Sequence, residues 1–191
     1  MKTLLSRLAT LAVGVALLAV GASGQSSNDA ELTAQLKKLF PSAATFSAKT
    51  GTPAHYKAFG PAAGGKQGEL LGLAYWTTEL EPLERGFDGP IKMLVGLSTE
   101  GKITGVIVTD HREPYGYFSV DLPEWPKQFE GKSVRDAFKV GQDVDAISRA
   151  TISVTSASRA IRNSSRKIAR AYLAPPESPP STAAAPAAAA Q

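Results

Sequence analysis

The chain has no cysteine and only two histidines, His55 and His111, among its 191 residues. The absence of cysteine excludes disulfides, thiolate zinc sites, iron–sulfur clusters, covalently attached c-type haem and a lipid anchor on cysteine. Two imidazoles are too few for a multi-histidine metal site. We therefore expect any redox chemistry of this chain to come from an organic cofactor.

Long apolar runs are also scarce. The run Leu8–Val20 follows Lys2 and Arg7, precedes small residues, and is shorter than the ~20 apolar residues that cross a bilayer. That order is typical of a secretory signal peptide. We expect residues 1–24 to be a signal peptide and the product to be periplasmic, with a membrane-peripheral position left open.

The C-terminal residues 174–191 consist mostly of Pro, Ala and Ser, a composition that cannot bury a core. We expect a disordered tail there and a single domain over residues 25–173, which is the usual size of one domain. The net charge of +4, from 21 basic and 17 acidic residues, is modest. No nucleic-acid partner is expected, because the protein is predicted to be exported.

Segments of strand character occupy the middle of the chain and helical patterns occupy both ends. A helix capped by Asn28 or Asp29 is expected through Phe40, a short one over Ser133–Phe138, and a long one over Ile152–Leu173. The predicted strands are Tyr56–Phe59, Leu70–Thr78, Ile91–Leu97 and Ile103–Thr109. The pattern predicts an α+β fold, in which an N-terminal helix and a long C-terminal helix pack on a twisted antiparallel sheet.

Several glycines lie where the predicted strands or their turns need a residue without a side chain. Gly101 ends a hairpin turn and is free to take a positive φ. Gly72, Gly96 and Gly105 lie inside strands, where a missing side chain indicates a bulge or the close approach of another group.

The long C-terminal helix has two unlike sides. At 100° per residue, one side is apolar and the other is basic, with no acidic residue between Arg149 and Arg170. The apolar set is Val154, Ala157, Ile161, Ile168 and Tyr172, and the basic set is Arg159, Arg162, Arg166 and Arg170. The basic side is either a solvated surface or a docking surface for an acidic partner or anionic lipid.

Two motifs suggest chemistry that their context does not support. The segment 60–66 fits the spacing of a phosphate-binding loop up to Lys66, but Gln67 stands where a hydroxyl should meet magnesium, and a strand-like segment follows instead of a helix. We interpret it as a glycine-rich turn. The run Asp110–Glu113 suggests acid–base catalysis, although a lone histidine near acids is more often an ordinary surface residue.

The segment Asp145–Ser153 differs in kind, because here the sequence resembles the FMN-binding domain family. Members include the G component of the Rnf complex, the C component of the sodium-translocating NADH:quinone reductase, and NosR, whose exported domain is the most similar of these. In that family FMN is joined by a phosphoester to the last threonine of a motif of Asp, two variable residues, Ser or Thr, Gly, Ala and Thr. Asp145, Ser148, Ala150 and Thr151 match this motif, and Arg149 replaces the usual glycine.

The resemblance extends over about residues 70–173. The segments Gly86–Ile91, Val95–Leu97 and Gly101–Val106 look like the family's hairpin, and Glu113–Gly116 is similar to a turn that lies near the flavin in relatives. The resemblance implies FMN as the cofactor and an FAD-dependent flavin transferase as the maturation partner. It also implies that Glu113, Tyr115 and Gly116 lie close to the cofactor.

The position of this motif also explains, in physical terms, why a phosphate could bind there. Thr151 precedes the long helix, whose first free N–H groups form an anion site suited to a phosphate, with added hydrogen bonds from Ser148 or Arg149. If the backbone at position 149 has a positive φ, arginine is less favourable there than the usual glycine. The arginine side chain could instead bind the phosphate through two hydrogen bonds. Trp76 and Thr77 are further candidates for the walls of the flavin site. Trp76 and Tyr115 fit core or rim packing equally well.

We therefore expect an exported electron carrier, rather than a complete enzyme, that exchanges electrons with a periplasmic or membrane redox protein. The alternative is an interaction or accessory module for a periplasmic metalloenzyme system, either without flavin or with FMN held non-covalently.

Overall fold

The computed structural model describes residues 23–62 and 64–173. The predicted tail and residues 1–22 of the predicted signal peptide lie outside this range. Within the described range, no helix is both long enough and apolar enough to span a bilayer.

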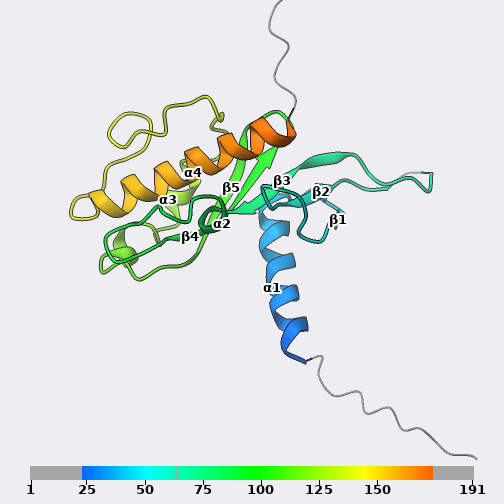
Figure 1. Ribbon diagram of the computed structural model, residues 1–191, viewed down its shortest axis with the longest axis horizontal. Coiled ribbons are helices and arrows are strands. Elements are labelled where there is room, and N and C mark those ends of the chain that lie inside the picture. Colours follow the sequence, from blue (N-terminus) through cyan, green and yellow to red (C-terminus); the bar gives the residue numbers. More distant parts are fainter. Residues whose placement is uncertain (1–22, 63, 174–191) are drawn as a thin grey trace, which may run out of the picture.

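A five-stranded antiparallel sheet forms the centre of the molecule (Figure 1). Its strands pair in sequence order: β1 (Thr45–Phe46), β2 (Tyr56–Phe59), β3 (Leu70–Trp76), β4 (Lys92–Ser98) and β5 (Ile103–Asp110). The helices are α1 (Ser23–Leu39), α2 (Thr77–Leu80), α3 (Glu124–Lys127) and α4 (Thr151–Tyr172), with a 3₁₀ turn at Gly116–Phe118. The predicted α+β fold is confirmed.

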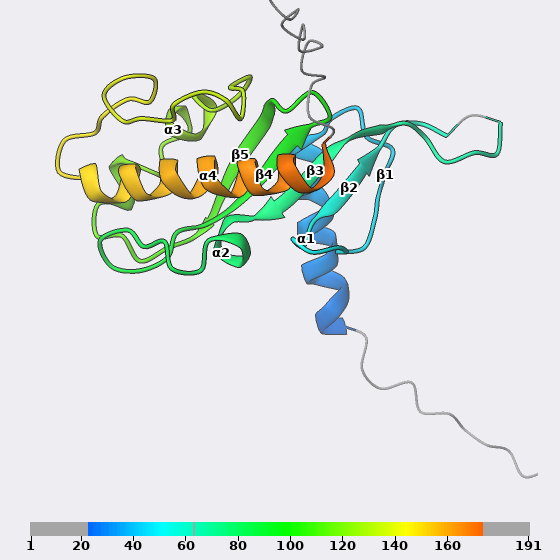
Figure 2. The ribbon, with the colours of Figure 1, turned by 45° about the horizontal axis from the view of Figure 1, so that its top comes forward.

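The two long helices use opposite faces of the sheet (Figure 2). Side chains alternate along β3, so that Leu73 and Tyr75 join the core beneath α4, while Ala74 lies in the core beneath α1 and Trp76 packs against it. Helix α1 contacts the sheet through its C-terminal end and extends away from it toward its N-terminus.

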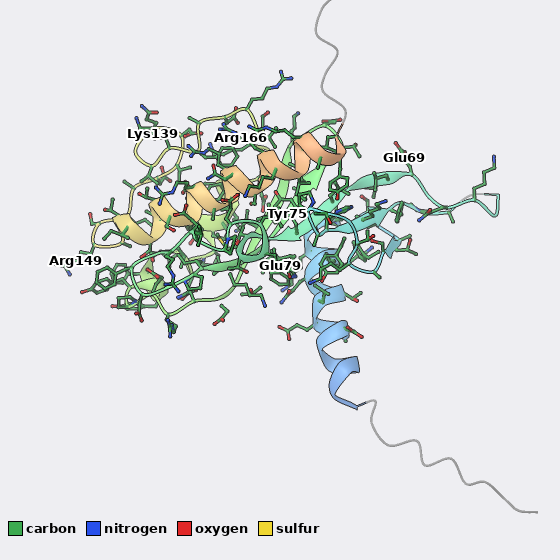
Figure 3. All side chains as sticks on the ribbon, in the orientation of Figure 1. Glu69, Tyr75, Glu79, Lys139, Arg149 and Arg166 are labelled. Atoms are coloured by element: carbon green, nitrogen blue, oxygen red, sulfur yellow. The ribbon has the colours of Figure 1, made fainter. Side chains whose placement is uncertain are left out.

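The predicted apolar side of α4 is buried, with Val154, Ile161 and Ile168 fully shielded from solvent. Tyr75, at the centre of the molecule (Figure 3), donates a hydrogen bond of 2.7 Å from its hydroxyl to Ser165 Oγ on α4. Burial raises the pKa of the Tyr75 phenol well above its usual range. Tyr172 lies at the end of the helix and remains partly exposed.

The glycines inside the strands are sites of close approach, as predicted. A Cβ on Gly72 would overlap the Leu97 carbonyl oxygen and the Phe40 ring, and one on Gly105 would lie 3.0 Å from Leu39 Cδ2. The missing side chains let the end of α1 settle on the sheet. Gly101 has a φ of 76°, as the hairpin turn requires.

Three predictions of local structure are wrong. The N-terminal helix begins at Ser23, so Asn28 and Asp29 lie inside it and do not cap it. The strand expected to reach Thr78 ends at Trp76, because Thr77 begins α2. No helix forms over Ser133–Phe138. The carboxylate of Asp136 instead accepts the Ser133 N–H at 2.9 Å to close a turn, and Phe138 has a φ of 52°, which a right-handed helix does not allow. The segment 60–66 belongs to the β2–β3 connection and leads into a strand, so it is not a phosphate-binding loop.

Candidate functional site

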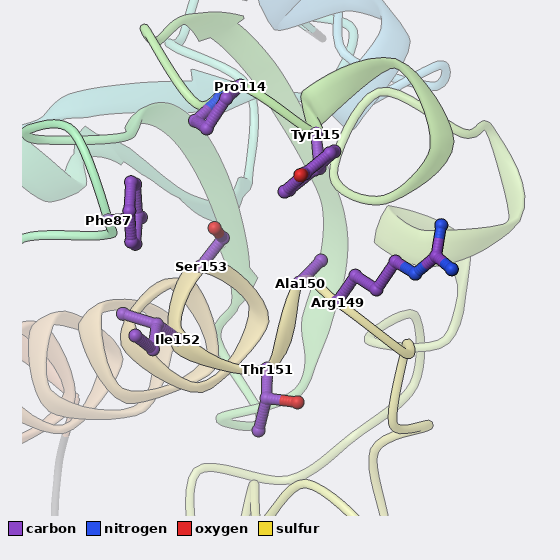
Figure 4. A pocket seen from close by; sticks show the side chains of 8 residues that line it. All are labelled: Phe87, Pro114, Tyr115, Arg149, Ala150, Thr151, Ile152 and Ser153. Atoms are coloured by element: carbon purple, nitrogen blue, oxygen red, sulfur yellow. The ribbon is translucent and has the colours of Figure 1, made fainter.

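A pocket of about 260 Å³ lies at the N-terminal end of α4. Three segments form it: the first residues of α4 with the turn before them, the loop before β4, and the turn after β5. Its lining residues, drawn in Figure 4, are Phe87, Pro114, Tyr115, Arg149, Ala150, Thr151, Ile152 and Ser153.

A tight turn presents Thr151 at this pocket. The Ala150 N–H donates to the Ile147 carbonyl oxygen at 3.2 Å, and Arg149, the third residue of the turn, has a φ of 66°. Buried Ala150 anchors the turn in the core, whereas Thr151, the first residue of α4, is exposed. The Arg149 side chain extends away from Phe87 and Ser153 (Figure 4).

The start of α4 offers donors for an anion. The first hydrogen bond of the helix runs from the Val154 N–H to the Ala150 carbonyl oxygen at 2.9 Å, so the N–H groups of residues 151–153 precede the helical ladder. Among the described residues, no side chain caps this end, and its first turn has no acidic residue. Free N–H groups and the helix dipole together favour a phosphate here.

Glu113 lies beneath the pocket and joins its walls. This carboxylate is only 6% exposed. It accepts hydrogen bonds from the backbone N–H of Phe87 at 2.9 Å and of Asp88 at 3.1 Å, and another from the hydroxyl of Ser153. Because three donors engage it inside the protein, Glu113 supports the pocket without lining it.

The histidine of the Asp110–Glu113 motif organises the same turn. The Glu113 N–H donates to His111 Nδ1 at 3.0 Å, so Nε2 carries the proton and donates to Asp121 Oδ1 at 2.7 Å. A Cβ on Gly116 would overlap the imidazole ring. Both ring nitrogens are therefore engaged in holding the turn after β5.

The region that builds this pocket matches a known family model, the FMN-binding domain, over residues 86–166. Residues 86–166 are thus similar to the FMN-binding domain family. The match covers the loop before β4, the turn after β5 and most of α4, which are the segments that meet at the pocket. It indicates FMN as the cofactor.

The chain is also similar to curated proteins. The chain is 35% identical over 88 residues to the G component of the ion-translocating oxidoreductase complex of Shewanella baltica, and 33% and 31% identical over the same length to the proteins of that name in Vibrio parahaemolyticus and Vibrio vulnificus. Each alignment covers 41% of this chain and 42% of the relative. The chain thus spans about two fifths of the length of these curated relatives.

The pocket residues suit the two unlike parts of FMN. The phosphate needs donors, which the start of α4 supplies beside the exposed Thr151 hydroxyl. The isoalloxazine ring needs apolar surface, which Phe87, Tyr115 and Ile152 offer at 67%, 44% and 58% exposure. Large apolar side chains this exposed beside one pocket lack a covering partner within the described part of the chain.

The structure gathers some of the predicted site residues and separates others. Thr151, Arg149, Ala150 and Tyr115 line the pocket. Glu113 is hydrogen-bonded to the wall residues Phe87 and Ser153, and Gly116 follows Tyr115 and lies against the His111 ring. Asp145 and Ser148 are exposed in the segment that precedes α4, and they do not line the pocket.

Trp76 and Thr77, the further candidates for the walls of the flavin site, do not line this pocket. Trp76 packs against the core beneath α1 and lies under the Lys92 ammonium at 4.5 Å. The buried Thr77 hydroxyl accepts the Met93 N–H at 3.1 Å. Trp76 thus packs within the sheet, and the Thr77 hydroxyl connects the start of α2 to β4.

Sequence reasoning did not single out three lining residues as site residues: Phe87, Ile152 and Ser153. Pro114 belongs to the turn Glu113–Gly116 that the resemblance placed near the flavin. Phe87 carried a signal, because it is a lone aromatic residue within a polar, glycine-flanked loop. The bond from Ser153 to Glu113 spans 40 residues of sequence, and no local pattern announces it.

The predicted basic side of α4 is divided among different partners. Arg159 forms a two-point ion pair with Glu84, with Nε at 2.7 Å from Oε2 and Nη2 at 2.5 Å from Oε1. Arg166 donates to the carbonyl oxygens of Val134 and Asp136, both at 2.8 Å. Arg170 is exposed beside Arg135 at a shallow hollow. The four arginines are thus not one continuous solvated row.

Proposed function

We propose that this chain is an exported electron carrier in which FMN is joined through a phosphoester to the hydroxyl of Thr151. The observation that carries the proposal is the exposed Thr151 hydroxyl at the first residue of α4, beside a pocket with exposed apolar walls. The match of residues 86–166 to the FMN-binding domain supports the choice of cofactor.

The attachment reaction needs a second protein, an FAD-dependent flavin transferase. The Thr151 oxygen forms a bond to the flavin-side phosphorus of FAD, the pyrophosphate bond breaks, AMP leaves, and the hydroxyl proton is released. The product gains the mass of FMN less one water. No oxidant or reductant is consumed in this step.

The chain's own residues then hold and orient the cofactor. The N–H groups of residues 151–153 receive the phosphate, and Phe87, Tyr115 and Ile152 offer apolar contacts to the ring. When bound, FMN supplies the electron-transfer chemistry, which requires no acid or base from the protein. A covalent tether keeps the flavin at the site, at an effective concentration in the millimolar range, after export.

We propose a membrane or periplasmic redox protein as the electron-transfer partner. The similar proteins of Shewanella baltica and the two Vibrio species bear the name of a component of an ion-translocating oxidoreductase complex, which supports a membrane partner.

Co-expression of the full chain with a flavin transferase, followed by intact mass measurement, tests the proposal. The wild-type protein should gain the mass of FMN less water, and Thr151→Ala should abolish the gain. Thr155→Ala removes another exposed hydroxyl one turn along α4 and should leave the gain intact. Yellow protein of unmodified mass would contradict the covalent bond but not the binding of flavin. Colourless, unmodified wild-type protein would contradict the carrier function.

A further inference from the structure

One buried carboxylate connects two walls of the pocket that are distant in sequence. Glu113 lies 26 residues from Phe87 and 40 residues from Ser153, yet it accepts hydrogen bonds from both. The first belongs to the loop before β4, and the second belongs to the first turn of α4. The position of that loop relative to the helix therefore depends on this carboxylate.

The loop is built to receive the carboxylate closely. A Cβ on Gly86 would overlap the Glu113 carboxylate, so only glycine permits the approach. The Gly86 N–H closes the loop on the Gly89 carbonyl oxygen at 2.7 Å, which leaves the N–H groups of Phe87 and Asp88 directed at Glu113.

Packing contacts hold the Phe87 side chain only weakly, because it is 67% exposed. Its position in the pocket wall is therefore set by its backbone, which Glu113 holds. The neighbouring Arg112 adds one bond to the same loop, from Nη2 to the Asp88 carbonyl oxygen at 3.2 Å.

We infer that Glu113 is a positioning residue, which fixes the Phe87 wall against the start of α4 and so sets the width of the flavin site without contacting the flavin. This inference rests on the proposed function. It assigns Glu113 a role different from that of a cofactor ligand, because its oxygen atoms are occupied by Phe87, Asp88 and Ser153.

Glu113→Gln tests this role, with Glu84→Gln as the matched control. The amide introduced at position 113 would present one acceptor oxygen where the carboxylate presents two, so at least one of the three bonds is lost. Glu84 is a shielded carboxylate near the other end of the same loop, bonded to Ser156 and Arg159 and outside the pocket lining. Both substitutions lower stability, but only Glu113→Gln should alter the site.

The first readout uses protein without flavin. Amide hydrogen exchange at Phe87 and Asp88 should accelerate by about tenfold or more in Glu113→Gln and remain within about twofold of wild type in Glu84→Gln. Ser153→Ala, which keeps the carboxylate but removes the link to α4, should give an intermediate acceleration. This variant also serves if Glu113→Gln does not fold.

The second readout uses flavinylated protein, in which flavin fluorescence and visible circular dichroism report on the ring's contacts with the pocket walls. Both should change in Glu113→Gln and Ser153→Ala and remain as in wild type in Glu84→Gln. Equal changes in Glu84→Gln, or no change in either of the other two variants, would overturn the inference. If wild-type protein takes up no flavin, the proposed function fails, and the exchange measurement still decides whether Glu113 positions the loop.

Discussion

Arg149 and Thr151 lie two residues apart at the start of α4, the first with a left-handed backbone of φ 66° and the second with an exposed hydroxyl. The left-handed region costs a residue with a side chain about 1–2 kcal/mol relative to its preferred conformation. The turn that presents Thr151 therefore retains backbone strain at Arg149.

Arg149→Gly should relieve that strain. We expect the free energy of unfolding of the flavin-free protein to rise by about 0.5–1 kcal/mol, because the greater backbone freedom of unfolded glycine offsets part of the gain. Arg149→Ala is the matched control, since it removes the guanidinium but keeps the left-handed conformation at a residue with a Cβ. Urea unfolding of the three proteins gives the comparison. Equal stability of the Gly and Ala variants would show that the backbone is not strained.

The ion pair between Glu84 and Arg159 predicts a pH dependence. Hydrogen bonding from Arg159, with help from Ser156, holds the pKa of Glu84 below its ordinary value of 4.5. A carboxylate whose pKa is lower in the folded state stabilises the protein above its unfolded pKa, and this contribution is lost as the pH falls through the folded pKa.

Glu84→Gln should therefore destabilise the protein by about 1–2 kcal/mol at pH 7, a figure reduced for the exposure of Arg159. The difference from wild type should shrink as the pH falls below about 4.5. Urea unfolding across pH 3–7 measures it. A difference that persists unchanged at pH 3 would contradict the assigned cause.

The contact between α1 and the sheet predicts unequal effects of two glycine substitutions. A methyl group at Gly72 would meet the rigid Leu97 carbonyl, whereas one at Gly105 would meet only the flexible tip of Leu39. We expect Gly72→Ala to cost about 2–3 kcal/mol, and Gly105→Ala to cost clearly less. Thermal or urea unfolding distinguishes them, and a reversed order would contradict the described packing.

Sequence patterns predicted the features that depend on near neighbours. The spacing of Val154, Ala157 and Ile161 identified the buried side of α4, and the run from Asp145 to Thr151 identified the residues at its start. Contacts between residues distant in sequence were harder to predict. Trp76 and Tyr75 are adjacent in sequence but point to opposite faces of the sheet, so an aromatic residue in that strand did not by itself indicate the flavin site.

The helix predicted over Ser133–Phe138 shows a second limit of prediction from sequence. Its composition permits a helix, but the Asp136 side chain closes a turn on Ser133, and Arg166 of α4 binds the carbonyl oxygens of Val134 and Asp136. That competition between local helix formation and contacts with a distant helix is decided only in the folded structure.

The most direct test of the account is to locate the flavin within the chain. Trypsin cleavage after Arg149 and Arg159 releases the peptide 150–159, which contains Thr151, Ser153, Thr155, Ser156 and Ser158. Fragmentation of this peptide from flavinylated protein should place the mass of FMN less water on the N-terminal pair Ala150–Thr151. An unmodified Ala150–Thr151 fragment, with the added mass on a later residue or on another peptide, would contradict the account.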